Sequence, residues 1–94
     1  MPKPKQLCPW WRLQVIAEAE VARLAPYSLI IPCVQHNDDE IVWDDECEGV
    51  GRVPWRCHYL VPPGNPERAL VSILNRAMAP WQSRYDLGVT RELV

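Results

Sequence analysis

Apolar side chains recur every three or four residues through the first part of the chain: Trp10, Leu13, Ile16, Ala17, Val21 and Leu24. This spacing predicts an amphipathic helix over residues 9–24. Pro9 can open the helix, because a proline in the first turn loses no helical hydrogen bond. Pro26 ends it, since the residue before a proline is disfavoured in helical backbone. Residues 1–8 are predicted to form a tail.

The middle of the chain carries shorter apolar runs that predict strands at 27–34, 40–45 and 52–61. Polar residues predict turns between them, at 37–39 and 48–51. Alternation is clearest in the third run, where Val53, Trp55 and Cys57 fall on one face. Pro32 and Pro54 cannot donate a ladder hydrogen bond, so each indicates a strand edge or a strand end.

Asn65-Pro66-Glu67 predicts the start of a second helix, with a capping amide, a first-turn proline and an acid near the positive helix end. An apolar stripe follows: Ala69, Leu70, Ile73, Leu74, Ala77 and Met78. Pro80 is predicted to end this helix. Residues 81–94 have a weaker pattern, so a short final helix and a flexible tail fit equally well.

The predicted order is therefore helix, two or three antiparallel strands, helix and tail. Turns between the strands are short enough for a meander but too short for a parallel crossover. The expected fold is α+β, with both helices packed on one face of a small twisted antiparallel sheet. The 94 residues are the size of one domain. Residues 1–8 and about 82–94 are its candidate flexible tails.

The charge distribution changes this picture of an ordinary small domain. Seven acids occupy the eleven positions from 38 to 48: Asp38, Asp39, Glu40, Asp44, Asp45, Glu46 and Glu48. The chain has net charge −2, so this segment near −7 leaves about +5 on all other residues. Such a patch can steer a basic partner. The alternative is a solvated hairpin edge whose charges prevent aggregation. Trp43, inside the run, is the candidate hydrophobic anchor.

The composition and spacing of residues disfavour several classes of protein. No stretch approaches the ~20 apolar residues that span a bilayer, and the N-terminal lysines precede no apolar signal core. We therefore expect a cytoplasmic protein that does not enter a membrane, with its cysteines reduced. The acidic run lacks the regular ligand spacing of a calcium loop, and the four glycines are too scattered for a phosphate-binding loop.

Cysteine and histidine leave one metal alternative open. Cys33 and His36 have a spacing that zinc sites use, and Cys47 and Cys57 could complete a tetrahedral set. Cys57 and His58 are adjacent on a predicted strand and so point to opposite faces, which weakens the zinc site. No local signature marks any cysteine as a nucleophile. We expect no enzyme activity and no cofactor, with zinc as the alternative.

Two further alternatives concern partners. Arg52, Arg56 and Arg68 could contact nucleic acid, but a net negative chain lacks the basic footprint of a nucleic-acid-binding domain. Adjacent Trp10 and Trp11 cannot both face the core of one helix, so we expect one to be exposed. A homodimer through exposed tryptophans, or through an open sheet edge, is the second alternative.

The stretch from Tyr27 to Trp81 resembles small accessory proteins of bacteriophages and prophages. It contains Ile41-Val42-Trp43, Trp55-Arg56-Cys57 and then Gly64-Asn65-Pro66-Glu67-Arg68-Ala69-Leu70, which is similar to the Gly-Thr-Pro…Ala-Leu helix entry of such proteins. Asn65 stands where those often have threonine. The resemblance brings no catalytic residues. It implies a protein of a mobile element, a class that includes inhibitors of bacterial immunity such as anti-CRISPR proteins.

These observations predict a non-enzymatic binding protein. Its acidic run, with Trp43, would cover a basic surface on a bacterial host protein, including one that binds nucleic acid. The patch would mainly raise the association rate and the specificity of that contact.

Overall fold

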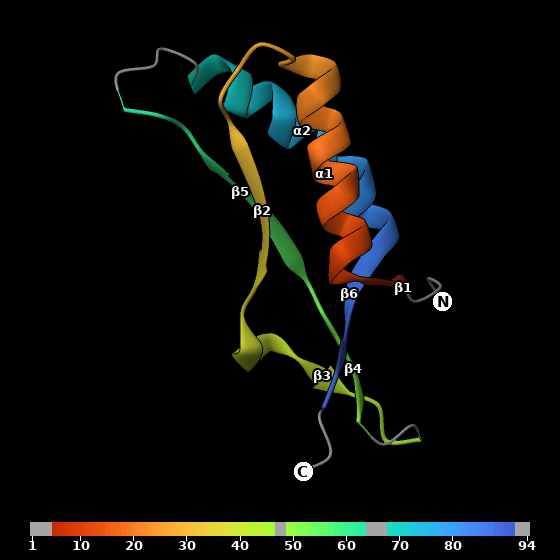
Figure 1. Ribbon diagram of the computed structural model, residues 1–94. Helices are drawn as coiled ribbons and strands as arrows, with labels where there is room; N and C mark the ends of the chain where they lie inside the picture. The colour runs from red at the N-terminus through yellow and green to blue at the C-terminus, as the bar shows by residue number, and fades with distance from the viewer. Residues whose placement is uncertain (1–4, 47–48, 64–67, 92–94) are drawn as a thin grey trace.

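The computed structural model describes residues 5–46, 49–63 and 68–91. Figure 1 shows two helices side by side along one side of a long, twisted pair of strands. The molecule is elongated, with extents of 47 × 35 × 19 Å. Its smallest extent is that of one layer of helices on one layer of sheet.

Helix α1 (Trp10–Leu24) confirms the helix predicted at 9–24. Leu13, Ala17 and Val21 are its buried residues. These positions are four apart, so they form one narrow stripe, and the rest of the helix surface is free for polar and aromatic side chains. The helix ends at Leu24 and is capped by Ala25, whose amide donates to the Val21 carbonyl.

Strand β1 (Gln6–Pro9) occupies part of the segment predicted to be a tail, so that prediction is wrong for residues 6–8. β1 pairs in parallel with β6 (Tyr85–Thr90), at the opposite end of the chain. Cys8 lies opposite Leu87, and each is 1% exposed. The prediction of an entirely antiparallel sheet is therefore wrong too.

β2 (Ile31–His36) and β5 (Trp55–Leu60) form an antiparallel two-stranded sheet against the helices. β2 begins four residues later than the strand predicted at 27–34. The strand predicted at 52–61 is two strands, because Pro54 separates β4 (Val50–Val53) from β5. A proline cannot donate to a ladder, and here the chain passes from one sheet to the other.

The second sheet has the order β1-β6-β4-β3. β3 (Val42–Trp43) is shorter than the strand predicted at 40–45, and a short 3₁₀ helix, η1 (Asp38–Glu40), stands at the predicted turn. β3 pairs with β4, and β4 pairs with β6, both antiparallel. The chain runs along β2, η1 and β3 and then turns back along β4 and β5, which makes one long hairpin (Figure 1). The end of this hairpin away from the helices, β3 and β4, belongs to the four-stranded sheet.

Helix α2 (Arg68–Arg84) continues through Pro80, so the prediction that Pro80 ends it is wrong. Pro80 and Arg76 are both exposed. The Arg76 carbonyl, which loses its helical donor to the proline, can therefore be hydrated. The start predicted at Asn65-Pro66-Glu67 lies outside the described residues.

β6 follows α2 directly, so neither alternative for residues 81–94 is correct as a whole. Residues 81–84 extend α2, and residues 85–90 form an inner strand with β1 on one side and β4 on the other. Leu87 aligns with both Cys8 and Val53, which is fully buried. Tyr85, Leu87 and Val89 alternate with Asp86 and Gly88, a strand pattern that the prediction for residues 81–94 missed.

The core has two parts under the same helices. The first joins both sheets to α1 and α2, and its buried members are Cys8, Leu13, Ala17, Val34, Val53, Trp55, Met78 and Leu87. The second lies nearer the start of α2, with Val21, Ile30, Tyr59 and Leu74. The Trp55 indole Nε1 donates to the Tyr85 carbonyl at 2.9 Å and so ties the two sheets together.

The fold class is thus α+β, as predicted, with a mixed four-stranded sheet and a two-stranded sheet in the described residues. The strand count and strand order differ from the prediction. No helix among the described residues is long and apolar enough to cross a bilayer.

Candidate functional site

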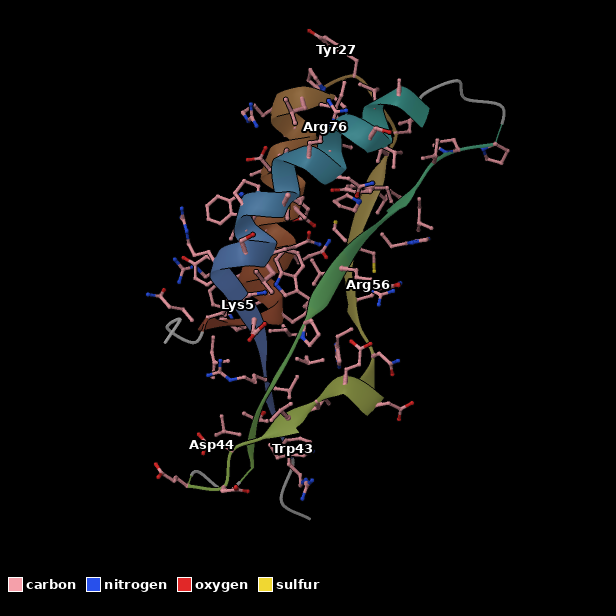
Figure 2. All side chains as sticks on the ribbon, turned by 180° about the vertical axis from the view of Figure 1, so that it is seen from behind. Lys5, Tyr27, Trp43, Asp44, Arg56 and Arg76 are labelled. Atoms are coloured by element: carbon pink, nitrogen blue, oxygen red, sulfur yellow. The ribbon has the colours of Figure 1, made fainter. Side chains whose placement is uncertain are left out.

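The acidic residues gather at the end of the molecule away from the helices. Figure 2 shows Trp43 and Asp44 at that end, with Tyr27 and Arg76 at the opposite one. We call the described carboxylates of this region the acidic end: Asp38, Asp39, Glu40, Asp44, Asp45 and Glu46. Three belong to η1 and three follow β3, so the strand separates two groups. Glu48 and Cys47 lie outside the described residues.

Polar side chains shape both groups locally. The Asn37 side chain accepts a hydrogen bond from the Asp39 amide at 3.0 Å and caps η1. The Asp44 carboxylate accepts one from the Glu46 amide at 2.9 Å. These are turns in which an Asn or Asp side chain replaces a backbone acceptor. Gly49 then takes φ = 83°, a left-handed conformation that favours glycine, just before β4.

Two members of the acidic end have partners within the chain. Asp38 lies 2.9 Å from His36 Nε2, and Glu40 lies 3.9 Å from Arg56 Nη2. Both of these contacts are solvent-exposed, and exposed pairs contribute little. Asp39, Asp44, Asp45 and Glu46 make no ion pair with any described residue. The acidic end therefore keeps most of its charge directed outward.

Trp43 was the predicted anchor, and the structure gives it a structural role. It is 37% exposed. One face of its ring system lies over Gly51, where a Cβ would be only 2.8 Å from Trp43 Cε3. The Arg91 guanidinium lies 4.3 Å from the ring centroid, at cation–π distance. A partner could reach the remaining part of the ring, but contacts with Gly51 and Arg91 of its own chain fix the position of Trp43.

A half-open hollow of about 330 Å³ lies where the two-stranded sheet meets η1. Its polar lining combines Gln35, Arg56 and His58 from the outer face with His36 and Glu40. The volume is at the lower limit of small-molecule sites. The sequence placed Arg56 and His58 on one face of a strand. It could not place Gln35 or Glu40 beside them, because that depends on the register of β2 and β5.

The structure separates the candidate zinc ligands. Cys33 and His36 lie three residues apart in β2, so they point to opposite faces of the strand. Cys57 is paired with Val34 on the helix side, whereas Cys33 is paired with His58 on the outer side. Within residues 5–46, 49–63 and 68–91, no group of three or more potential ligands is close enough to hold a metal. The fourth candidate, Cys47, lies outside these ranges.

Two of the described thiols, those of Cys8 and Cys57, lack the lowered pKa of a nucleophile. Burial raises the pKa of the Cys8 thiol and that of the Cys57 thiol. A catalytic thiol needs the opposite shift, because its thiolate is the reactive form. Burial likewise raises the pKa of Tyr59, whose hydroxyl is buried with no hydrogen-bond partner among the described residues.

Two of the arginines predicted to contact nucleic acid, Arg52 and Arg56, lie in different sheets. Arg52 Nη1 lies 3.5 Å from an Asp86 carboxylate oxygen and donates to the Lys5 carbonyl at 3.2 Å. Arg56 lies in the other sheet, close to Glu40. The side chain of Arg68 lies outside the described part. The arrangement gives no support to the nucleic-acid alternative, which needs a continuous basic footprint.

The exposed tryptophans were predicted only in part. Trp10 is 47% exposed and Trp11 is 65% exposed, so both lie at the surface. Trp10 is nevertheless fixed, since its Nε1 donates to the Val34 carbonyl at 2.8 Å. Trp81 packs against the first core and stacks with Tyr85, with ring centroids 6.1 Å apart.

No family model matches this sequence, and comparisons with curated proteins and with solved structures find no similar protein. The resemblance to phage accessory proteins therefore stays a prediction. Any assignment of function depends on the residues and their arrangement.

Proposed function

We propose that this chain is a binding protein whose acidic end docks on a basic surface of another protein. One observation carries the proposal: four carboxylates at one end of an elongated molecule, Asp39, Asp44, Asp45 and Glu46, make no ion pair with any described residue. These charges neutralise no described cation of the chain, although the Asp44 carboxylate also accepts the Glu46 amide. A partner outside the chain is the alternative that this geometry favours.

Such a surface acts first on the rate of association. Charges of one sign attract a partner of opposite charge and can raise association rates by about 10- to 1000-fold, an effect that falls with ionic strength. Exposed pairs add little to the affinity itself. The exposed part of Trp43 and the hollow beside Glu40 are the nearest features that could add short-range contacts.

The nature of the partner rests on the sequence resemblance alone. A phage accessory protein would act in the bacterial cytoplasm, and its partner would be a host protein with a basic surface, such as a nucleic-acid-binding groove. Covering that surface would inhibit the host protein, as anti-CRISPR proteins do. The acidic end is suited to this role because its carboxylates can occupy a groove that binds phosphates.

The test is affinity capture from a bacterial lysate, followed by kinetics with the captured protein. The variant Asp44→Asn/Asp45→Asn/Glu46→Gln removes three charges, and the asparagine at position 44 keeps an acceptor for the Glu46 amide. We expect unchanged folding and slower association, with the largest loss at low salt. The single variants Asp45→Asn and Glu18→Gln form a matched pair, since both side chains are exposed and each loses one charge. Equal binding by the triple variant and the wild type at every salt concentration would contradict the proposal.

A further inference from the structure

The two edges of the β2–β5 sheet differ in how they are protected. Along β2, the Gln14 side chain donates to the Pro32 carbonyl at 2.7 Å and accepts from the Val34 amide at 2.9 Å. The Trp10 indole donates to the Val34 carbonyl. Side chains of α1 therefore take the place of a neighbouring strand. Natural proteins protect sheet edges in this way because a free edge pairs with other chains.

These contacts also fix which backbone groups of β5 are free. The Val34 amide and carbonyl point away from β5, so the residues of β2 that face β5 are Ile31, Cys33 and Gln35. Their partners are Leu60, His58 and Arg56. In an antiparallel pair these hydrogen-bonded positions alternate with positions that point outward. Trp55, Cys57 and Tyr59 therefore direct their amides and carbonyls to the outer edge of β5.

The outer edge of β5 is protected at one point only among the described residues. Gln82 Nε2 donates to the Trp55 carbonyl at 3.4 Å. β5 has no strand neighbour there, because the sheet order is β2-β5. No described group bonds the outward amides and carbonyls of Cys57 and Tyr59. This leaves two complete donor–acceptor positions, two residues apart, on an open edge.

We propose that this edge pairs with the same edge of a second copy of the chain, forming an antiparallel β5–β5 dimer. Cys57 of each copy would lie opposite Tyr59 of the other, because these are the residues whose backbone groups are free. The twofold axis then passes beside His58. The two copies together would form one four-stranded sheet, with Arg56 of each copy opposite Leu60 of the other.

The charge distribution favours a second copy as the occupant. The acidic end lies at one end of the long molecule, while Arg76 lies at the other (Figure 2). An antiparallel pair around His58 places the acidic end of each copy toward the Arg76 end of its neighbour. The two acidic ends then lie far apart, at opposite ends of the pair. A parallel arrangement would bring the two acidic ends together.

The first measurement is the mass of the full chain in solution by light scattering or sedimentation. We expect a concentration-dependent approach to twice the 10.9 kDa of one chain. The variant His58→Lys places like charges directly opposite at the twofold axis and should weaken the dimer by up to about fivefold. Gln35→Lys is the matched control, since it is exposed on the same face but lies in β2, away from the open edge. Its dimer should be as strong as that of the wild type.

Cross-linking tests the register independently. The variants carry Cys33→Ser, so that no second thiol faces position 58 within one chain. Position 58 would face itself across the axis at a Cα distance of about 4.5 Å, which a disulfide can span. His58→Cys should therefore form a covalent dimer on oxidation, whereas Leu60→Cys, opposite Arg56 of the other copy, should form far less. A monomer at every concentration, or equal cross-linking by both variants, overturns the proposal. A monomer that instead pairs with a strand of another protein overturns it as well.

Discussion

The Gln14 side chain replaces a neighbouring strand at the edge of β2, and its removal gives a quantitative test of this fold. In Gln14→Ala, the Pro32 carbonyl and the Val34 amide lose their partners, which lie at 2.7 and 2.9 Å. A hydrogen bond of this kind contributes about 1 kcal/mol net, so we expect a loss of about 2 kcal/mol in the free energy of unfolding. For a chain of this length, that corresponds to a decrease in Tm of about 8–15 °C.

The matched control is Glu18→Ala, one turn further along α1. Glu18 is exposed, and the only hydrogen bond of its side chain to a described residue is from Gln14 itself, at 3.4 Å. Both substitutions gain a similar few tenths of a kcal/mol in helix propensity, so the difference between them isolates the contacts with β2. Urea unfolding monitored by tryptophan fluorescence gives both free energies. Equal stability of the two variants would refute the role of Gln14 at the strand edge.

A second substitution at the same position separates the two hydrogen bonds. Gln14→Glu keeps an acceptor for the Val34 amide but, when ionised, cannot donate to the Pro32 carbonyl. Only the protonated acid can make both bonds, so folding raises the pKa of the introduced carboxyl group above its unfolded value. The extra stability is then present below the unfolded pKa, about 4.3, and is lost as pH rises through the folded pKa. Compared with the wild type, the variant should be least stable near neutral pH. A stability difference that does not change with pH would exclude the bond to Pro32.

The other predictions concern packing and buried thiols. Gly51→Ala places a Cβ at 2.8 Å from both Ile41 Cγ2 and Trp43 Cε3, and we expect a loss of about 1–3 kcal/mol in urea unfolding. Gly88→Ala is the control, since its Cβ comes no nearer than 3.5 Å to its neighbours; similar losses in both variants would show that the contact with Trp43 is unimportant. Folding raises the pKa of Cys8 above its ordinary 9.0, so the stability associated with the neutral thiol is complete below pH 9.0 and is lost as pH rises through the folded pKa. Unfolding free energies compared at neutral pH and near pH 10 should show this decline in the wild type and a smaller one in Cys8→Ala; an identical decline in both would exclude Cys8 as a source.

The elements that the sequence predicted correctly are those with strong local patterns. Helix α1 has an apolar stripe of its own, β2 lies in a short apolar run, and β5 has alternating apolar residues. β6 alternates as well, with Tyr85, Leu87 and Val89 on one face, but its run is short and contains Asp86 and Gly88, which are uncommon in strands. It is an inner strand because Leu87 lies between Cys8, from near the start of the chain, and Val53, from its middle. Single-sequence patterns do not contain that information.

The candidate site was also predictable from the sequence only in part. The exposure of the acidic run followed from its composition, since so many charges cannot be buried together. Its internal contacts did not, because the pairing of Glu40 with Arg56 depends on how η1 meets β5. The spacing of Cys33 and His36 suits a metal site only in a turn. In β2 the same spacing separates them, so the metal prediction depended on the backbone conformation.

The position of the acidic end in the long hairpin explains how binding and folding can be tested separately. Trp43, Gly51 and Val89 are aligned across β3, β4 and β6, and Arg91 covers the Trp43 ring. This row holds the far part of the hairpin in place without using any carboxylate of the acidic end. Neutralising Asp44, Asp45 and Glu46 should therefore leave stability nearly unchanged. Substituting Trp43 would disturb this row as well as the proposed interface, so a loss of binding in that variant could not be assigned to contact with the partner.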